Sequence, residues 1–277
     1  MNCLPVSFAV LLWAGWLQAQ APSQPAPEPL PVLILTGQRD RYHDFKDTTA
    51  RIRGILEETG RFTVKVNEEP RGLSAATLSP YLAIIINYMD SGQPEKRFGP
   101  ASEQALLDYV SHGGGLILLH ASLGSFRTWP EYEKLAGGVY RPGHGRHGAR
   151  QDIPVRIEAP DHPVMRGLRS PLIHYADELY AGMLFPGVAG FTLLASAWDD
   201  HSLYKPADRA RLVGPGAQVP VVWTVSFGKG RVYACTLGHD AEIQRSRTYT
   251  TLLSRGTEWA ATGDVTLPIP IELQRRP

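Results

Sequence analysis

Three histidines in this 277-residue chain each follow an apolar segment. His43 comes after VLILT, His120 after LILL and His239 after RVYACTLG. The ordinary pKa of histidine lies near neutrality, so its ring can serve as an acid, a base or a metal ligand. Because the carboxyl ends of parallel strands meet at one edge of an open α/β sheet, where ligands bind, we expect the three rings to share a site.

His120 is the leading candidate for an acid or base. It stands in GGGLILLHASLG, where the strand turns toward a helix, but neither G-x-S-x-G nor a cysteine is present there. Glutamine amide hydrolysis is set aside because the thiolate it needs is missing. Ser122 could be a nucleophile only with His120 as its base, and their closeness in sequence makes that geometry awkward. The structural alternative for His120 is an imidazole hydrogen-bonded to a nearby carbonyl group.

An aspartate follows directly after two of these histidines. Asp44 follows His43 and Asp240 follows His239. A carboxylate beside an imidazole commonly fixes its tautomer and raises its basicity, so both aspartates are candidate substrate-binding residues. The structural alternative is that they cap the helices that follow.

A Gly- and His-rich loop over residues 137–151 contains His144 and His147. Its GHGRHG satisfies G-x-G-x-x-G, but no strand precedes it and no helix pattern follows, so no nucleotide cofactor is expected. Two histidines three residues apart can bind a metal, although solvated surface histidines are commoner. His43 and His239 are candidate catalytic residues, either as metal ligands or as electrophilic partners of His120. His147 joins them as a candidate ligand for a divalent metal such as zinc.

The segment HYADELY offers a second polar cluster. His174 and Glu178 are four residues apart, so they face the same way whether the segment is a helix or a strand. Glu178 is a candidate substrate contact, although a solvated carboxylate is the default for it or for Asp177 taken singly. Tyr180 and Trp129 could stack on the apolar face of a sugar ring; the alternative is that they border the core.

From residue 31 onward, short β-branched segments alternate with amphipathic ones, a pattern typical of βαβ units on a parallel sheet. VLILT is apolar throughout, as expected of a strand covered on both faces. Residues 219–237 predict two strands joined by a Gly-Lys-Gly turn, hence an antiparallel hairpin. Other strands are predicted at 62–66, 82–88, 116–119, 153–158 and 192–197, and helices at 46–60, 99–114 and 246–261.

The chain divides into four parts. Residues 1–21 predict a signal peptide, with an apolar run at 6–17 that is too short to span a bilayer and cleavage near Ala21. Residues 22–31 form a Pro-rich linker, 32–268 one α/β domain and 269–277 a C-terminal tail. We therefore expect a secreted or periplasmic protein in which Cys235 is the one remaining cysteine, so that no internal disulfide can form.

The formal net charge of +1 is spread over interspersed acidic and basic residues. This pattern argues against nucleic acid or an anionic membrane as a partner, and favours a neutral or weakly charged small molecule. The sequence leaves the oligomeric state open.

Several ordered motifs resemble one family. TGQRDRYHDFKDTTARIRGILEETGRFTVKV, GGGLILLHAS, DELY, PVVWTVSFGKGRVYACTLGHD and RGTEWAATG are similar to the ThuA-like (trehalose utilization) family, from about Val32 to Pro268. The resemblance implies a flavodoxin-like fold similar to class I glutamine amidotransferases, with helices on both faces of the sheet and without amidotransferase activity.

The resemblance also implies carbohydrate metabolism, alongside sugar dehydrogenases that make 3-keto glycosides. Our hypothesis is a lyase or hydrolase that acts on an oxidised disaccharide or glycoside by histidine acid/base chemistry, with or without a metal. A sugar oxidoreductase would then be a partner in the same pathway. The alternative is a non-catalytic sugar-binding or accessory module of a dehydrogenase system, for which a flat aromatic platform would be expected in place of clustered imidazoles.

Overall fold

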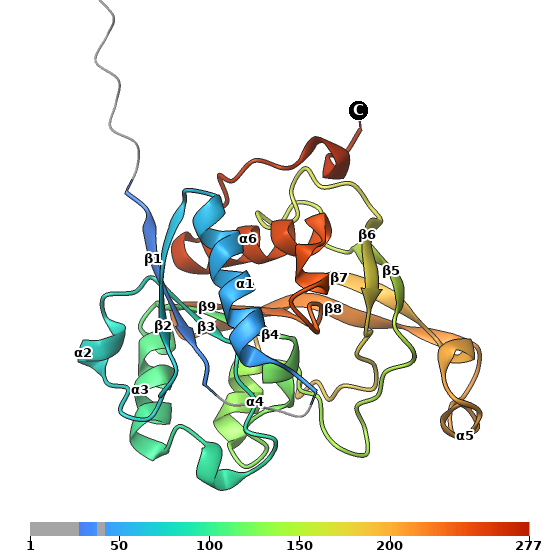
Figure 1. Ribbon diagram of the computed structural model, residues 1–277, viewed down its shortest axis with the longest axis horizontal. Coiled ribbons are helices and arrows are strands. Elements are labelled where there is room, and N and C mark those ends of the chain that lie inside the picture. Colours follow the sequence, from blue (N-terminus) through green and yellow to red (C-terminus); the bar gives the residue numbers. More distant parts are fainter. Residues whose placement is uncertain (1–27, 38–41, 277) are drawn as a thin grey trace, which may run out of the picture.

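A mixed β-sheet organises the chain in this computed structural model, which describes residues 28–37 and 42–276 (Figure 1). Within those residues the sheet has nine strands in the order β2-β1-β3-β4-β9-β8-β7-β5-β6. The parallel part consists of β2 (Phe62–Asn67), β1 (Leu30–Leu35), β3 (Ala83–Ile86), β4 (Gly115–Leu119) and β9 (Gly230–Cys235). The antiparallel part consists of β8 (Gly216–Phe227), β7 (Phe191–Asp200), β5 (Gln151–Ile157) and β6 (Leu172–Asp177).

Helices cover both faces of the sheet. α1 (Phe45–Glu58) and α6 (Arg247–Thr262) lie on one face, and α2 (Ala75–Leu78), α3 (Pro100–Ser111) and α4 (Pro130–Ala136) on the other (Figure 1). α5 (Pro206–Arg209) lies at the far end of the β7–β8 extension. The expected α/β class, with a largely parallel sheet between two helical layers, is confirmed.

Two hydrophobic clusters explain why the first strand is apolar at successive positions. Val32 and Ile34 pack in the cluster that includes Ile52 of α1, whereas Leu33 and Leu35 pack in the cluster of α3 and α4. Successive side chains of a strand point to opposite faces, so a strand between two helical layers needs no polar position.

The predicted antiparallel hairpin is also confirmed. β8 and β9 pair from Val222 opposite Cys235 to Phe227 opposite Gly230. The last helix begins at Arg247, one residue later than expected, and β1 begins at Leu30, inside the predicted linker.

Strand direction determines which loops can meet. β1, β4 and β9 run in the same direction, and the four antiparallel steps from β9 through β8, β7 and β5 to β6 restore that direction in β6. The segments that follow β1, β4, β9 and β6 therefore all leave from the same edge. β6 also lies beside α6, where the Thr248 hydroxyl donates to the carbonyl oxygen of Ile173 at 2.6 Å.

The described C-terminal residues lie against the rest of the molecule. Leu273, in a short 3₁₀ helix (η5, Ile271–Leu273), is buried, and its carbonyl accepts from the amide of Arg169. The predicted signal peptide and most of the linker lie outside the described residues. Among the described helices, none combines the length and apolar character needed to cross a bilayer.

Candidate functional site

His43, His120 and His239 lie together, as their positions after three strands predict. One ligand nitrogen from each ring falls within 4.8 Å of the others. The ring centroid of His43 lies 5.3 Å from that of His120 and 4.8 Å from that of His239. All three side chains are largely buried. The site therefore joins the segments that follow β1, β4 and β9.

His120 is held in one orientation by the neighbouring strand segment. Its backbone has φ +38° at the start of a 3₁₀ helix (η2, His120–Gly124), and its Nδ1 lies 2.6 Å from the carbonyl oxygen of Thr236. A carbonyl can only accept, so Nδ1 carries the proton and Nε2 presents a lone pair. Burial lowers the pKa of His120 to about 3, which keeps the ring neutral. These features suit a metal ligand better than an acid.

Two polar side chains from the segment after β6 reach the histidine nitrogens. The Tyr180 hydroxyl lies 2.9 Å from Nε2 of His120, and Oε2 of Glu178 lies 3.1 Å from Nδ1 of His239. That Nδ1 is itself 3.2 Å from Nε2 of His120. Burial raises the pKa of the Glu178 carboxyl, but its hydrogen bond to His239 and the nearby histidines lower it more, so the net pKa is below its usual value. Glu178 is thus ionised at neutral pH.

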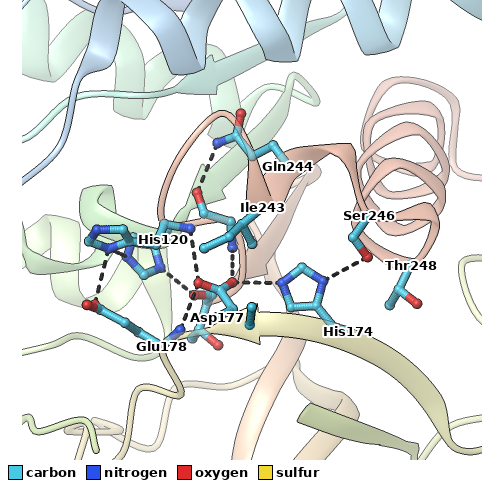
Figure 2. Close-up of polar contacts among 12 residues, drawn as sticks. His120, His174, Asp177, Glu178, Ile243, Gln244, Ser246 and Thr248 are labelled. Atoms are coloured by element: carbon cyan, nitrogen blue, oxygen red, sulfur yellow. Dashed lines mark hydrogen bonds and ion pairs between the residues drawn. The ribbon is translucent and has the colours of Figure 1, made fainter. Parts of the chain in front are cut away.

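Asp177 was missed as a functional residue, since a solvated carboxylate was the default expectation for it. It is fully buried, and its carboxylate accepts from the His174 ring and from three backbone amides, those of Glu178, Gly238 and His239 (Figure 2). Burial raises its pKa, but the hydrogen bond from His174 and the nearby histidines hold the net pKa below the usual range. Nothing in the segment HYADELY indicates that the side chain of Asp177 is buried.

His174 and Glu178 face different partners, although their even spacing predicted that they face the same way. His174 bonds to Asp177 and to Ser246, whereas Glu178 faces His239 (Figure 2). The strand ends at Asp177, and Ala176 has φ +54°, so the regular alternation of side chains is broken before Glu178. The spacing rule holds only within a regular element.

Of the two aspartates that follow histidines, Asp44 caps α1, which was the structural alternative, and Asp240 bonds within a turn. Oδ1 of Asp44 accepts from the amides of Lys46 and Asp47 at the start of α1. Oδ1 of Asp240 accepts from the amides of Glu242 and Ile243, in the turn before a short 3₁₀ helix (η4, Ile243–Arg245). Asp240 also pairs with Arg150 of the Gly- and His-rich loop at 2.8 Å. These contacts give neither aspartate the expected role beside a histidine ring.

The remaining candidates differ in how close they lie to the cluster. Tyr180 is buried against the ring of His120, with centroids 4.3 Å apart. Trp129 is instead a core residue, packed against Phe126 and Tyr132, and cannot offer its face to a sugar. His147 is exposed at the border of the site, with Nε2 3.8 Å from Oε2 of Glu178.

The three imidazoles fit a divalent metal. Zinc in a catalytic site takes three protein ligands and keeps a fourth position open, and Zn–N bonds of about 2.0–2.1 Å place tetrahedral ligand nitrogens about 3.4 Å apart. Nε2 of His120 and Nδ1 of His239 lie 3.2 Å apart, and the whole set falls within 4.8 Å. Binding a metal requires Nδ1 of His239 to give up the proton that it donates to Glu178. The lone pair on Nε2 of His120 is the form that binds metal.

A separate cavity of about 800 Å³ lies at the opposite edge of the sheet, between α2 and α3. Its lining, which includes Leu78, Leu82, Tyr109 and Gly114, is mostly apolar. Leu82 and Gly114 precede β3 and β4, so this cavity lies at the amino ends of the strands. It contributes nothing to the histidine cluster.

Comparison with known proteins agrees with the fold. The ThuA family model, described as trehalose utilisation, matches residues 31–260. A ThuA-like protein from Parabacteroides merdae is 27% identical with a TM-score of 0.72, over 89% of this chain and 95% of that one. A ThuA-like protein from Bacteroides uniformis is 21% identical with a TM-score of 0.67, over 88% and 97%.

A more distant likeness concerns the fold alone. A β-galactosidase from Rahnella sp. R3 is 15% identical with a TM-score of 0.53, and the match covers 82% of this chain but 30% of that enzyme. No curated protein matches this chain.

Proposed function

The chain belongs to the ThuA family, and we propose that it processes an oxidised carbohydrate, releasing the group at C1 of a 3-keto glycoside or disaccharide. The observation that carries this proposal is the convergence of three histidines with Glu178 and Tyr180. Several titratable groups at one point are typical of catalytic sites. Clustered imidazoles, with Trp129 buried in the core, favour catalysis over a sugar-binding module.

In this proposal His43, His120 and His239 hold a divalent cation such as zinc. When bound, the cation supplies positive charge that stabilises an anion developing on the substrate carbonyl oxygen. The Thr236 carbonyl keeps the proton on Nδ1 of His120, so that Nε2 stays available as a donor atom. His120 thus changes from the expected acid or base to a ligand.

Glu178 is then the proton acceptor. A carbonyl group at C3 of a sugar acidifies the hydrogen on C2, and an ionised carboxylate beside the histidines can remove it. The C1–O bond breaks with its electron pair on the departing oxygen, while a C1=C2 double bond forms. The departing oxygen takes a proton from Tyr180, and the proton that Glu178 removed from C2 returns through solvent to the Tyr180 oxygen, which restores both groups. The step consumes no oxidant or reductant.

The chemical structure of the proposed substrate determines which class of reaction must supply it. A 3-keto sugar arises by oxidation of a hydroxyl group, so a sugar oxidoreductase must supply it. We also propose that residues 1–21 direct export to the periplasm or beyond, which amino-terminal sequencing of the exported protein would test.

The test combines metal analysis with turnover of a 3-keto disaccharide, in chelated and zinc-supplemented buffer. We expect His120→Ala to lose both metal and turnover. Glu178→Gln should keep the metal and lose turnover by about 10²-fold or more, because it removes the proton acceptor alone. The control is His112→Ala, which alters a histidine at the opposite edge of the sheet.

Full turnover by His120→Ala would remove the histidine cluster from the mechanism, and full turnover by Glu178→Gln would remove the base. Saturable binding of the unoxidised sugar without turnover of the keto sugar would instead support the binding module.

A further inference from the structure

We propose that Asp177 is a positioning residue, which sets the distance between Glu178 and His239 and is itself oriented by His174 and Ser246. This inference rests on the proposed function, in which Glu178 and His239 work side by side. The hydrogen bonds of the Asp177 carboxylate run to His174 and to three backbone amides, so its role is to place the groups that do the chemistry.

The first argument is the sharing of one oxygen atom. Oδ1 of Asp177 accepts from the amide of Glu178 at 2.8 Å and from the amide of His239 at 3.3 Å. The side chains of the same two residues meet with Nδ1 and Oε2 3.1 Å apart. A single buried oxygen thus fixes both backbones from which the paired side chains extend.

The second argument is the distance in sequence between the parts that are joined. Asp177 ends β6, whereas Gly238 and His239 follow β9, and three other strands lie between these two in the sheet. Oδ2 of Asp177 accepts from the Gly238 amide at 2.6 Å. The carboxylate is therefore a direct link between two loops that the sheet itself does not connect.

The orientation of the carboxylate is fixed from its other side. An ionised carboxylate only accepts, so Nε2 of His174, 2.8 Å from Oδ2, carries a proton. Nδ1 of His174 lies 3.1 Å from the hydroxyl oxygen of Ser246, at the start of α6 (Figure 2). His174 is completely buried, and its ring is held between Asp177 and Ser246 by a hydrogen bond to each.

A series of Ser, His and Asp also occurs in serine hydrolases, where Ser is the nucleophile. Here the carboxylate carries three backbone amides in addition to the histidine, and those amides belong to the neighbours of the proposed site. This distribution of bonds favours positioning over activation of Ser246, and the two roles predict different results.

The decisive variant is Asp177→Asn. Both oxygens of Asp177 accept from donors, so the amide group of asparagine must face a donor whichever way it turns. Glu258→Gln is a matched control, because Glu258 is equally buried and each of its oxygens accepts from donors, in α6 and away from the histidines.

Two measurements on the full chain test the proposal. Native-state hydrogen exchange should show the amides of Glu178, Gly238 and His239 exchanging at least about tenfold faster in Asp177→Asn than in Glu258→Gln, compared at equal global stability. Titration with Co²⁺, followed by its visible absorption spectrum, should show affinity lowered by about 10–100-fold in Asp177→Asn and unchanged in Glu258→Gln. Ser246→Ala should shift both readouts in the same direction but less.

The outcomes separate this inference from the proposed function. If the unaltered protein binds no Co²⁺, the metal in the proposed function is wrong, and hydrogen exchange still decides the role of Asp177. Equal exchange at the three amides in both variants would overturn the inference. Complete loss of turnover in Ser246→Ala with unchanged Co²⁺ affinity would overturn it as well, because it would make Ser246 a nucleophile.

Discussion

Nδ1 of His120 lies 2.6 Å from the carbonyl oxygen of Thr236, which is three residues before His239 in the chain. The hydrogen bond crosses between the segments that follow β4 and β9, two parallel neighbours in the sheet. It fixes the tautomer of one histidine of the cluster by means of the segment that carries another. The relative position of His120 and His239 is therefore set by the pairing of β4 with β9 in the sheet.

This relationship predicts the protonation of His120 in metal-free protein. Burial lowers its pKa from 6.5 to about 3, so the ring should stay neutral, with the proton on Nδ1, from about pH 5 to about pH 8. The unfolded chain binds this proton below pH 6.5 and the folded chain does not until about pH 3. Stability should thus fall as pH drops through that window, by up to about 1.4 kcal/mol per pH unit.

Nitrogen-15 NMR of the imidazole rings gives the tautomer directly, with exposed His112 as the internal comparison. A His120 ring that titrates near pH 6.5 in the folded protein would contradict the prediction.

Tyr180→Phe should separate catalysis from metal binding. The substitution removes the hydroxyl that lies 2.9 Å from Nε2 of His120 and keeps the ring that packs on it. We expect turnover of a 3-keto disaccharide to fall by about tenfold or more, since the proton donor to the departing oxygen is lost. Zinc affinity should not fall, because the hydroxyl and the metal use the same lone pair.

The prediction is checked by measuring the turnover and the zinc affinity of Tyr180→Phe on the same preparation. Tyr204→Phe is the control, since its hydroxyl bonds to Asp199 outside the cluster. Unchanged turnover in Tyr180→Phe would exclude Tyr180 as the proton donor.

Gly238→Ala should damage the site through the backbone. Gly238 has φ +99°, and a Cβ atom there would lie 2.3 Å from Cε2 of the buried Tyr249 ring. Strain and overlap together should lower the free energy of unfolding by about 2 kcal/mol or more, and should displace His239 and weaken zinc binding.

Gly54→Ala is the matched control, because Gly54 lies within α1 and its added Cβ would meet nothing within 4 Å. It should raise stability by about 0.5–1 kcal/mol. Thermal unfolding of both variants tests this prediction. Equal unfolding midpoints would show that neither the positive φ of Gly238 nor the contact with Tyr249 limits stability.

Cys235 should be inert in the folded protein. Burial raises its pKa to about 12, and its side chain is 1% exposed, so hardly any thiolate is present or accessible at pH 8. In a Cys3→Ser background, a thiol reagent should not react until denaturant is added. Rapid reaction of one thiol under native conditions would show that β9 opens locally.

The sequence predicted the three-histidine cluster because parallel strands impose a common exit edge, whatever the details of packing. It could not predict Asp177, whose burial depends on β6 lying beside α6 after four reversals of strand direction. Such long-range pairing leaves no periodic signal in HYADELY.

The loop residues were the least predictable part of the site. Asp44 and Asp240 carry the same pattern whether they bond to nearby backbone amides or orient an imidazole. The local bonds prevail because the helix start after Asp44 and the turn after Asp240 each offer two amide donors at once. Trp129 likewise could border a site or a core, and only its contacts with Phe126 and Tyr132 decide for the core.

The position of β9 between β4 and β8 has a consequence for how the chain is made. Among the strands of the described residues, β9 is the last to leave the ribosome, yet it lies between β2-β1-β3-β4 and β8-β7-β5-β6. Until it arrives, β4 and β8 each lack the neighbour that β9 provides, and an unpaired strand edge can pair wrongly with another chain. Successful biosynthesis therefore depends on keeping those edges apart or shielded until translation is almost complete.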